Sequence, residues 1–370
     1  MFTEKSNIKV GILTLPPRYN YGGILQAYAL QKHLKTLGYD AYLIDREPPK
    51  APGRKIMTWI KEHVVEGPTR DFVKKWLSPR TQVIKDQSTM QKIVQEYGFD
   101  ALVVGSDQVW RLEYSPIALN YFFDFAESSP VKKISYAASF GVDNWNHPAE
   151  VTNKVKALVQ NMDAVSVRED SGVEICKTAF NVDAIQVIDP TLLLKQTDYL
   201  ELINSEPNTP TKNRLAVYVL DSSGEKQQII DRIAAHKKLS PLPLNVKRSF
   251  SKQNLLKLRE CIYPKVTNWL FGFYQSDFIV TDSFHGVAFS IIFNKQFIAI
   301  GNKGRGLARF QSILKLFNIS DRLIFSPEDL TPELMDRKID YEMVEKIRDA
   351  KRAEANNFLT SSLSIKAEKI

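Results

Sequence analysis

The sequence predicts an α/β protein made of two Rossmann-like domains, each built around a parallel β-sheet. Three observations predict this fold class. Short apolar runs alternate with helical segments along the 370-residue chain, and the apolar runs end in polar residues or glycine. A polar, proline-containing stretch at 206–213 has the composition of a linker. A chain of this length is also expected to form two domains.

The N-terminal segment illustrates the pattern. Residues 8–13 form a short apolar run, and residues 24–34 follow with helical periodicity after a loop. Residues 41–45 form the next apolar run, which completes a strand–helix–strand unit and therefore requires a parallel sheet. Residues 46–100 are charged and are expected to be mostly helical.

The remaining elements repeat this pattern. Further strands of the first domain are expected at 101–105, 133–139, 164–168 and 184–188. The second domain is expected to contain strands at 214–220, 243–246, 278–280 and 297–301, and a helix at 224–237. We expect domains at 1–206 and 207–340, and a closing helix in 341–370 that can cross back to the first domain. Ligands of open parallel sheets bind beyond the carboxyl ends of the strands, so the cleft between the domains is the expected site.

The composition is that of an ordinary globular protein, 44% apolar and 25% charged. No run of eighteen apolar residues occurs and the N-terminus has no signal-peptide core, so we expect neither a transmembrane helix nor a signal peptide. Cys176 and Cys261 are far apart and suit a reduced cytoplasm. No metal-ligand spacing is present, and we expect a cytoplasmic protein with no metal and no cofactor.

The charge balance favours an anionic partner. Lysine and arginine outnumber aspartate and glutamate by 50 to 42, a net charge of +8. A phosphorylated small molecule, a lipid-linked diphosphate at a membrane surface and nucleic acid all fit such an excess. Because the basic residues form no dense run and no nucleic-acid motif occurs, we do not expect nucleic acid. Peripheral contact with the inner face of the cytoplasmic membrane stays open, and the sequence does not define the oligomeric state.

His285 is the leading catalytic candidate. It alone among five histidines follows a buried strand at the point where a helix is expected to begin, in the stretch T-D-S-F-H-G. Asp282 or Ser283 can cap that helix, which we expect to start near Gly286. A histidine in this position can deliver a proton, or it can be a packed and hydrogen-bonded core residue.

Cationic residues follow two other expected strands. Arg168 can bind a carboxylate or phosphate with its forked guanidinium, or it can pair with a neighbouring acid. Lys303, Arg305 and Arg309 follow the strand expected at 297–301, in the stretch N-K-G-R-G-L-A-R. With two glycines among them, these three cations form either a phosphate-binding loop or a solvated surface loop.

Two loops of the first domain carry further candidates. Gly22 and Gly23 precede a helix, where free backbone N–H groups can hold an anion or merely form a tight turn. Asp107 and Gln108 can bind sugar hydroxyls or cap their own loop, and Trp110 can stack on a sugar ring or pack in the core. Neither G-x-G-x-x-G nor G-x-x-x-x-G-K-[ST] occurs, so dinucleotide and P-loop sites have no support.

Six motifs in order resemble the polysaccharide pyruvyl transferases over about residues 8–330. They are N-Y-G-G-x-L-Q-A-Y-A-L, V-G-S-D-Q-x-W, S-Y-A-A-S-F-G, S-V-R-E-D-S-G, D-P-T-L-L-L and T-D-S-F-H-G. The resemblance implies a fold like the B-type glycosyltransferases. It also implies transfer of pyruvate from phosphoenolpyruvate, as a cyclic ketal, to a sugar of a bacterial surface polysaccharide or of its polyprenyl-diphosphate-linked precursor.

The resemblance implies roles for single residues. His285 matches the histidine of the family's R-x-H-G motif, the expected general acid, while Ser283 stands where that motif has arginine. Arg168 and Lys303 match cations expected to bind phosphoenolpyruvate. The other expected substrate-binding residues are Gly22, Gly23, Asp107, Gln108, Ser283, Arg305 and Arg309, of which the last two are chosen for their charge and position.

Two other functions fit the same architecture. One is a sugar-nucleotide-dependent B-type glycosyltransferase, because a fold does not fix the chemistry. The other is a non-catalytic protein of polysaccharide assembly. The first domain is the expected acceptor side, and the second carries the His285 motif.

Overall fold

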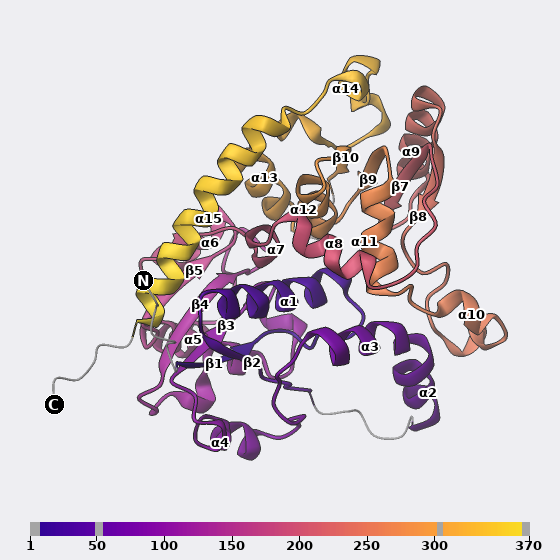
Figure 1. Cartoon of the computed structure of the whole chain (residues 1–370). Coiled ribbons are helices and arrows are strands. Elements are labelled where there is room, and N and C mark those ends of the chain that lie inside the picture. The colour runs from indigo at the N-terminus through magenta and orange to yellow at the C-terminus, as the bar shows by residue number, and fades with distance from the viewer. Residues whose placement is uncertain (1–7, 49–54, 302–305, 365–370) are drawn as a thin grey trace.

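The computed structural model describes residues 8–48, 55–301 and 306–364, which form two α/β units (Figure 1). Each unit contains one sheet in which all paired strands are parallel. The prediction of two parallel-sheet domains is therefore confirmed.

The first sheet has six strands in the order β2-β1-β3-β4-β5-β6. Its strands are β1 (Lys9–Leu13), β2 (Asp40–Leu43), β3 (Ala101–Val104), β4 (Lys132–Ala138), β5 (Ala164–Val167) and β6 (Ile185–Gln186). The helices of this part are α1 (Tyr21–Thr36), α2 (Lys55–Ile60), α3 (Gly67–Trp76), α4 (Gln87–Tyr97), α5 (Ala149–Gln160), α6 (Asp170–Ile175), α7 (Pro190–Leu193) and α8 (Gln196–Asn204). Because β2 and β3 lie on opposite sides of β1, the strand order reverses between β1 and β3, where such sheets bind ligands.

The second sheet has five strands in the order β11-β10-β9-β7-β8. Its strands are β7 (Arg214–Tyr218), β8 (Ser240–Pro243), β9 (Phe278–Thr281), β10 (Gln296–Ile300) and β11 (Leu323–Ile324). The helices are α9 (Gly224–Lys237), α10 (Leu258–Cys261), α11 (Val266–Gln275), α12 (Phe284–Ile292), α13 (Leu307–Leu316), α14 (Pro332–Asp336) and α15 (Tyr341–Leu363). Here the order reverses between β7 and β9, so each sheet has its own switch point.

The strand expected at 243–246 was placed too late in the sequence, because β8 spans Ser240–Pro243. The N–H groups of Ser240 and Leu244 bond to carbonyls of Asn213 and Val217 on the β7 side. Pro241 and Pro243 occupy alternate positions of the strand, where a backbone N–H group would point away from β7. Their lack of an N–H group therefore removes no hydrogen bond to β7. An edge strand tolerates proline in that position, and β8 is an edge strand.

A shared apolar core joins the two units. The Tyr21 ring of α1 stacks on Trp269 of α11 with centroids 5.2 Å apart. Tyr199 of α8 packs edge-to-face on Phe289 of α12 with centroids 5.1 Å apart. Such aromatic pairs contribute about 0.5–1.5 kcal/mol each beyond the area they bury. The contacts hold the two sheets so that loops beyond both switch points can line the same cavity.

The closing helix α15 contacts the first unit. The Arg352 guanidinium donates to the carbonyl of Leu192 at 3.2 Å, and Lys132 of β4 donates to the carbonyl of Ser362 at 3.1 Å. Figure 1 shows α15, in yellow, running from α14 of the second unit down beside β4 and β5. No helix within the described ranges has the length and apolar character needed to cross a bilayer.

Candidate active site

His285 lies in the first turn of α12, just beyond the carboxyl end of β9. This helix begins at Phe284, two residues before the expected start at Gly286. Ser283 occupies the N-cap position, but its side chain makes no capping hydrogen bond. Its backbone N–H instead donates to the Thr281 hydroxyl at 3.1 Å. The strand and the helix are therefore joined by a tight turn that places His285 at the switch point.

Asp282 does not cap α12 but ties the loops after β7 and β9 together. Its carboxylate accepts hydrogen bonds from the N–H of Leu220 at 2.6 Å and of Asp221 at 3.2 Å. The Lys226 ammonium donates to the same carboxylate at 2.6 Å. Asp282 is buried, so these charge-assisted bonds hold the segment that precedes His285 in place.

The imidazole of His285 packs directly against the backbone of Gly22. A Cβ added to Gly22 would lie 2.0 Å from Nδ1 of His285 and 2.3 Å from its Cγ. Only glycine allows this approach between α1 and α12. The positive end of the α1 dipole therefore lies at the ring and disfavours its protonated form.

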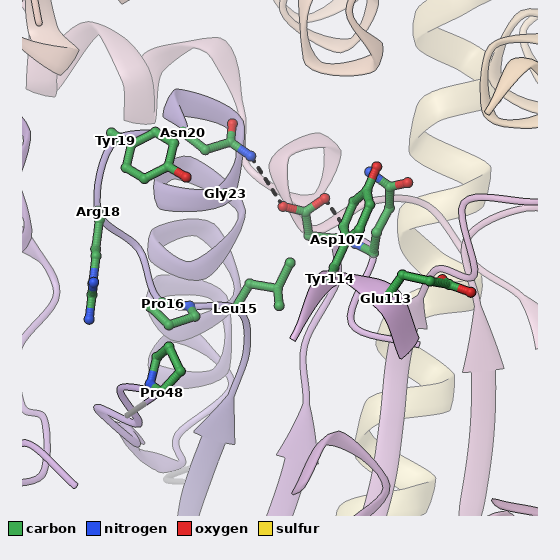
Figure 2. A pocket seen from close by; sticks show the side chains of 11 residues that line it. Leu15, Pro16, Arg18, Tyr19, Asn20, Gly23, Pro48, Asp107, Glu113 and Tyr114 are labelled. Atoms are coloured by element: carbon green, nitrogen blue, oxygen red, sulfur yellow. Dashed lines mark hydrogen bonds between the residues drawn. The ribbon is translucent and has the colours of Figure 1, made fainter. Parts of the chain in front are cut away.

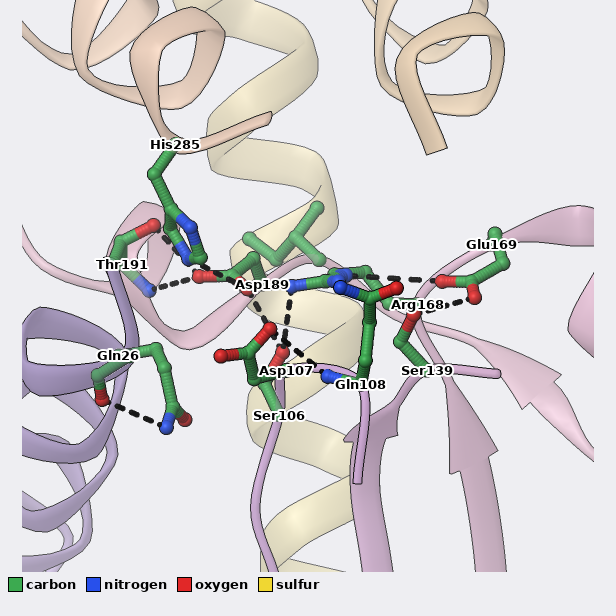
Figure 3. A network of polar contacts seen from close by, with 12 residues as sticks. Gln26, Ser106, Asp107, Gln108, Ser139, Arg168, Glu169, Asp189, Thr191 and His285 are labelled. Atoms are coloured by element: carbon green, nitrogen blue, oxygen red, sulfur yellow. Dashed lines mark hydrogen bonds and ion pairs between the residues drawn. The ribbon is translucent and has the colours of Figure 1, made fainter. Parts of the chain in front are cut away.

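Asp189 connects His285 to a buried polar network (Figure 3). Its carboxylate lies 3.8 Å from Nε2 of His285 and accepts hydrogen bonds from Nη1 of Arg168 at 2.9 Å and from the Ser106 hydroxyl at 2.8 Å. The N–H and hydroxyl of Thr191 donate to the other oxygen at 2.9 and 2.7 Å. Burial alone would raise the pKa of Asp189, but His285, Arg168 and Thr191 lower it below its usual value. The carboxylate is therefore charged when it faces the imidazole.

Asp189 was not among the residues that the sequence identified. It lies in the D-P-T motif beyond β6, so its position at a strand end followed by proline was the available signal. Its role as the centre of this network depends on residues from three other strand ends. Neither spacing nor periodicity indicates such a convergence.

Arg168 is buried and forms the ion pairs that the sequence offered as one of its two possible roles. Besides Asp189, its guanidinium lies 3.7 Å from Glu169 and 4.2 Å above the Phe284 ring. Burial would lower the pKa of Arg168, but Asp189 and Glu169 raise it above its usual value. Nη2 of Arg168 makes no hydrogen bond to any residue of the described ranges. A direct contact with substrate stays a prediction.

The pKa of His285 is lowered from its usual value. Burial is the largest cause, and Arg168 and Arg309 act in the same direction, while Asp189 and Asp107 oppose the shift. The imidazole is therefore neutral at neutral pH in this structure. Its Nε2 makes no hydrogen bond within the described part of the chain. An anion placed beside it would favour the protonated form.

A cavity of about 90 Å³ opens at His285. Its lining comes from loops at both switch points and from α13, and includes five residues expected at the site. The lining residues are Asn20, Asp107, Gln108, Tyr114, Leu220, Asp282, Ser283, Phe284, His285, Arg309 and Phe310. The structure thus brings together His285, Asp107, Gln108, Ser283 and Arg309. The two sheets contribute to one site.

Arg309 supplies positive charge to this cavity. It lies in the first turn of α13 and is buried. Burial and the nearby Arg168 lower the pKa of Arg309 to about 10, so it stays protonated at neutral pH. Ser283, which stands where the family motif has arginine, lines the same cavity. The expected ligands Lys303 and Arg305 lie outside the described residues.

A second cavity of about 610 Å³ adjoins the first on the side of the first sheet (Figure 2). The two cavities share Asn20, Asp107, Gln108 and Tyr114. Asp107, with φ of +78°, accepts hydrogen bonds from the Gln108 N–H at 2.9 Å and from the Asn20 amide at 3.4 Å. This bonding fixes Asp107 at the boundary between the two spaces. A Cβ on Gly23 would lie 3.3 Å from the Asp107 carboxylate.

Tyrosines supply the aromatic surface of the larger cavity, and Trp110 takes the second of its two expected roles. Trp110 is fully buried, donates to the carbonyl of Tyr121 at 3.0 Å and stacks on Phe122, so it belongs to the core. Tyr19 and Tyr114 line the cavity instead, with 46% and 47% of their surface exposed. Figure 2 shows these two rings on opposite sides of Asp107. Neither tyrosine was predicted from the sequence to lie at the site.

The family assignment adds to this geometry. A family model for polysaccharide pyruvyl transferase matches residues 20–304, more than half of the chain. The chain belongs to this family. The resemblance drawn from six motifs is thereby confirmed. His285, Asp189 and Asp107 lie within the matched region, whereas Arg309 lies beyond its end. Among curated protein sequences, none matches this pyruvyl transferase family member.

Solved structures share its fold at low sequence identity. UDP-GlcNAc 2-epimerase from Neisseria meningitidis, bound to UDP-GlcNAc, is 10% identical, with a TM-score of 0.55 over 96% of this chain and 99% of that chain. The Staphylococcus aureus MnaA–UDP structure is 12% identical, with a TM-score of 0.55 over 98% and 99%. These likenesses concern the fold alone.

Proposed function

We propose that this family member takes pyruvate from phosphoenolpyruvate and attaches it as a cyclic ketal to a saccharide of a bacterial surface polymer or of its lipid-linked precursor. The observation that carries the proposal is the place of His285 in a cavity lined from both sheets, beside Asp189 and Arg309. A proton donor and a fixed cation in one small space are what an anionic enol ester requires.

The smaller cavity is the proposed donor site. Phosphoenolpyruvate carries a carboxylate and a phosphate, which suit the Arg309 guanidinium and the helix N-termini of α1 and α12. We expect Arg168, Lys303 and Arg305 to add positive charge around the same anion. Gly22 and Gly23, in the first turn of α1, would present backbone N–H groups that have no partner inside the helix.

The reaction begins with proton transfer from His285 to the methylene carbon of phosphoenolpyruvate, which leaves a cation at the carbon that bears the phosphate oxygen. One sugar hydroxyl adds to that carbon and returns a proton to His285. A second hydroxyl then displaces the phosphate, which leaves with that hydroxyl's proton, and the ring of the ketal closes. The steps as written use neither a cofactor nor a metal. A positioned proton donor contributes roughly 10²–10⁴ in rate.

Asp189 is the proposed positioning residue for His285. Before the donor binds, the imidazole is neutral at neutral pH, because burial lowers the pKa of His285. The anionic donor would raise that pKa, and the charged Asp189 carboxylate would stabilise the imidazolium that results. Binding of phosphoenolpyruvate would thus prepare the acid that its own conversion needs.

The larger cavity is the proposed acceptor site. Its volume of about 610 Å³ lies in the range of small-molecule sites, whereas the cavity at His285 is about 90 Å³. The Tyr19 and Tyr114 rings provide faces for sugar rings, and Asp107 and Gln108 provide polar groups at the boundary with the donor site. A hydroxyl pair that reaches past Asp107 would meet the activated carbon near His285.

The test combines the protein with phosphoenolpyruvate and soluble glycans that carry suitable hydroxyl pairs. We expect acceptor-dependent phosphate release and a pyruvate ketal in the product by NMR. His285→Gln should reduce the rate at least roughly 100-fold. The matched control His236→Gln changes a histidine on α9 that lies outside both cavities, and it should leave the rate unchanged.

Two results would contradict the proposal. One is an absence of phosphate release with every acceptor, together with no rise in melting temperature on adding phosphoenolpyruvate. The other is stabilisation by UDP-sugars but not by phosphoenolpyruvate, which would favour the glycosyltransferase alternative. Full turnover by His285→Gln would remove His285 from the role of acid.

A further inference from the structure

Two segments at one edge of the molecule, α2 and the segment before α10, carry exposed apolar side chains. We name this surface the apolar–basic edge. Its apolar members are Ile56 and Trp59 of α2 and Leu255 and Leu256 of the 3₁₀ helix Lys252–Lys257. Its basic members are the lysines and arginines within 247–259. Ile56 is 76% exposed, Trp59 57% and Leu256 102%. Figure 1 shows α2 and α10 projecting at the right of the molecule. Leu256 buries nothing in this chain, so its apolar surface is free for a partner.

The charge of this edge is strongly positive. Residues 247–260 hold five cations (Lys247, Arg248, Lys252, Lys257 and Arg259) against one carboxylate, Glu260, a net +4. The whole chain has a net charge of +8. Half of that excess therefore lies in fourteen residues next to exposed leucines. Apolar side chains flanked by lysine and arginine fit an anionic lipid surface.

The edge is continuous with the larger cavity. The Tyr263 N–H donates to the carbonyl of Val65 at 2.9 Å, which links the segment after α10 to the segment after α2. The Tyr263 ring lies 5.9 Å from the ring of Tyr19, a residue of the cavity lining. The Lys61 ammonium lies 5.1 Å above the same Tyr19 ring. A surface that engaged this edge would therefore lie beside the cavity.

We propose that the apolar–basic edge docks on an anionic bilayer. Leu256, Ile56 and Trp59 enter the headgroup region, and the basic residues bind the acidic lipid headgroups. The larger cavity then faces a saccharide whose lipid anchor stays in the same bilayer. That last step rests on the function proposed above, whereas the docking itself does not. A second copy of this chain is a poorer occupant, because two surfaces of net +4 repel each other.

The experiment measures sedimentation of the wild-type protein with vesicles of phosphatidylcholine, with and without phosphatidylglycerol. We expect binding to the anionic vesicles only, and release in about 0.5 M salt, where charge interactions are screened within roughly 4 Å. Brominated phosphatidylglycerol should quench tryptophan fluorescence, and Trp59→Phe should remove most of that quenching, because the other tryptophans are buried or half-buried.

Two pairs of variants locate the surface. Lys252→Glu/Lys257→Glu should lower the partition coefficient at least roughly 30-fold, since each basic residue near an anionic surface contributes about a factor of five. The control pair, Lys85→Glu/Lys92→Glu, makes the same charge change at exposed positions near α4 and should have a much smaller effect. Leu256→Ser should lower binding roughly tenfold, while Met343→Ser, at an exposed position on α15, should not.

Equal binding to neutral and anionic vesicles, no binding, or equal losses in both lysine pairs would overturn the proposal. A wild-type dimer that Leu256→Ser converts to monomer would assign the edge to a second copy and would also overturn it. Turnover of soluble glycans separates the two proposals. If the protein converts soluble acceptors but does not bind vesicles, only the docking proposal is wrong. If it binds anionic vesicles but converts no acceptor, the docking proposal holds and the proposed function is wrong.

Discussion

At the scale of single residues, His285 owes its properties to its neighbours more than to its own sequence position. Burial keeps its pKa low, Asp189 lies 3.8 Å from Nε2, and Gly22 closes the opposite side of the ring. A lone histidine after a strand predicted where the proposed acid lies. The partners come from the loop after β6 and from α1, so only the folded chain shows them.

The pKa of His285 makes a prediction about stability. Its value in the fold is below the ordinary 6.5, so the unfolded chain takes up the proton at a higher pH than the folded chain does. The stability that the neutral imidazole provides is therefore complete above about pH 6.5 and is lost as the pH falls toward the folded-state pKa. His285→Gln should remove this part of the pH dependence.

Urea denaturation of wild type and His285→Gln between about pH 8 and about pH 5.5 checks the sign. The free energy of unfolding of the wild type should fall more steeply on acidification than that of the variant. His236→Gln, which changes a less buried histidine, serves as the control. A difference between wild type and His285→Gln that is constant with pH, or that grows in favour of the wild type on acidification, would contradict the assignment.

At the scale of elements, the order of the strands could be read from the sequence better than their exact bounds. The order of strands and helices and the place of His285 beyond β9 followed from apolar runs that end in polar residues. The start of α12 at Phe284 and the position of β8 did not. The Asp282 N–H donates to the Tyr218 carbonyl of the neighbouring strand, while the Ser283 N–H donates to the Thr281 hydroxyl within the same turn. The prolines of β8 are tolerated because β8 is an edge strand.

The close approach of α1 to α12 makes a prediction about Gly22. Gly22→Ala would place a methyl group 2.0 Å from Nδ1 of His285, so the imidazole must move. A displacement of about 1 Å at a reacting group can cost roughly 100-fold in rate, and we expect a loss of that size in kcat/KM for ketal formation. The matched control is Gly224→Ala at the start of α9, where an added Cβ meets no atom within 4 Å. Equal turnover by the two variants would contradict the packing described for His285.

At the scale of the whole molecule, the site exists because two switch points line one space. The sequence predicted two parallel sheets and a cleft between them, and the structure places lining residues from both sheets in the cavity at His285. The division into a small charged cavity and a larger one, and the identity of Asp107 at their boundary, could not be predicted. They depend on how α1, α8, α11 and α12 pack between the sheets, a matter of tertiary contacts rather than of local pattern.

A crystal structure of the wild-type protein with bound phosphoenolpyruvate tests the central claim most directly. The donor should occupy the smaller cavity, with its methylene carbon in contact with the His285 imidazole and its carboxylate or phosphate on Arg309. Phosphoenolpyruvate bound in the larger cavity, or elsewhere with its methylene carbon out of reach of His285, would contradict the account.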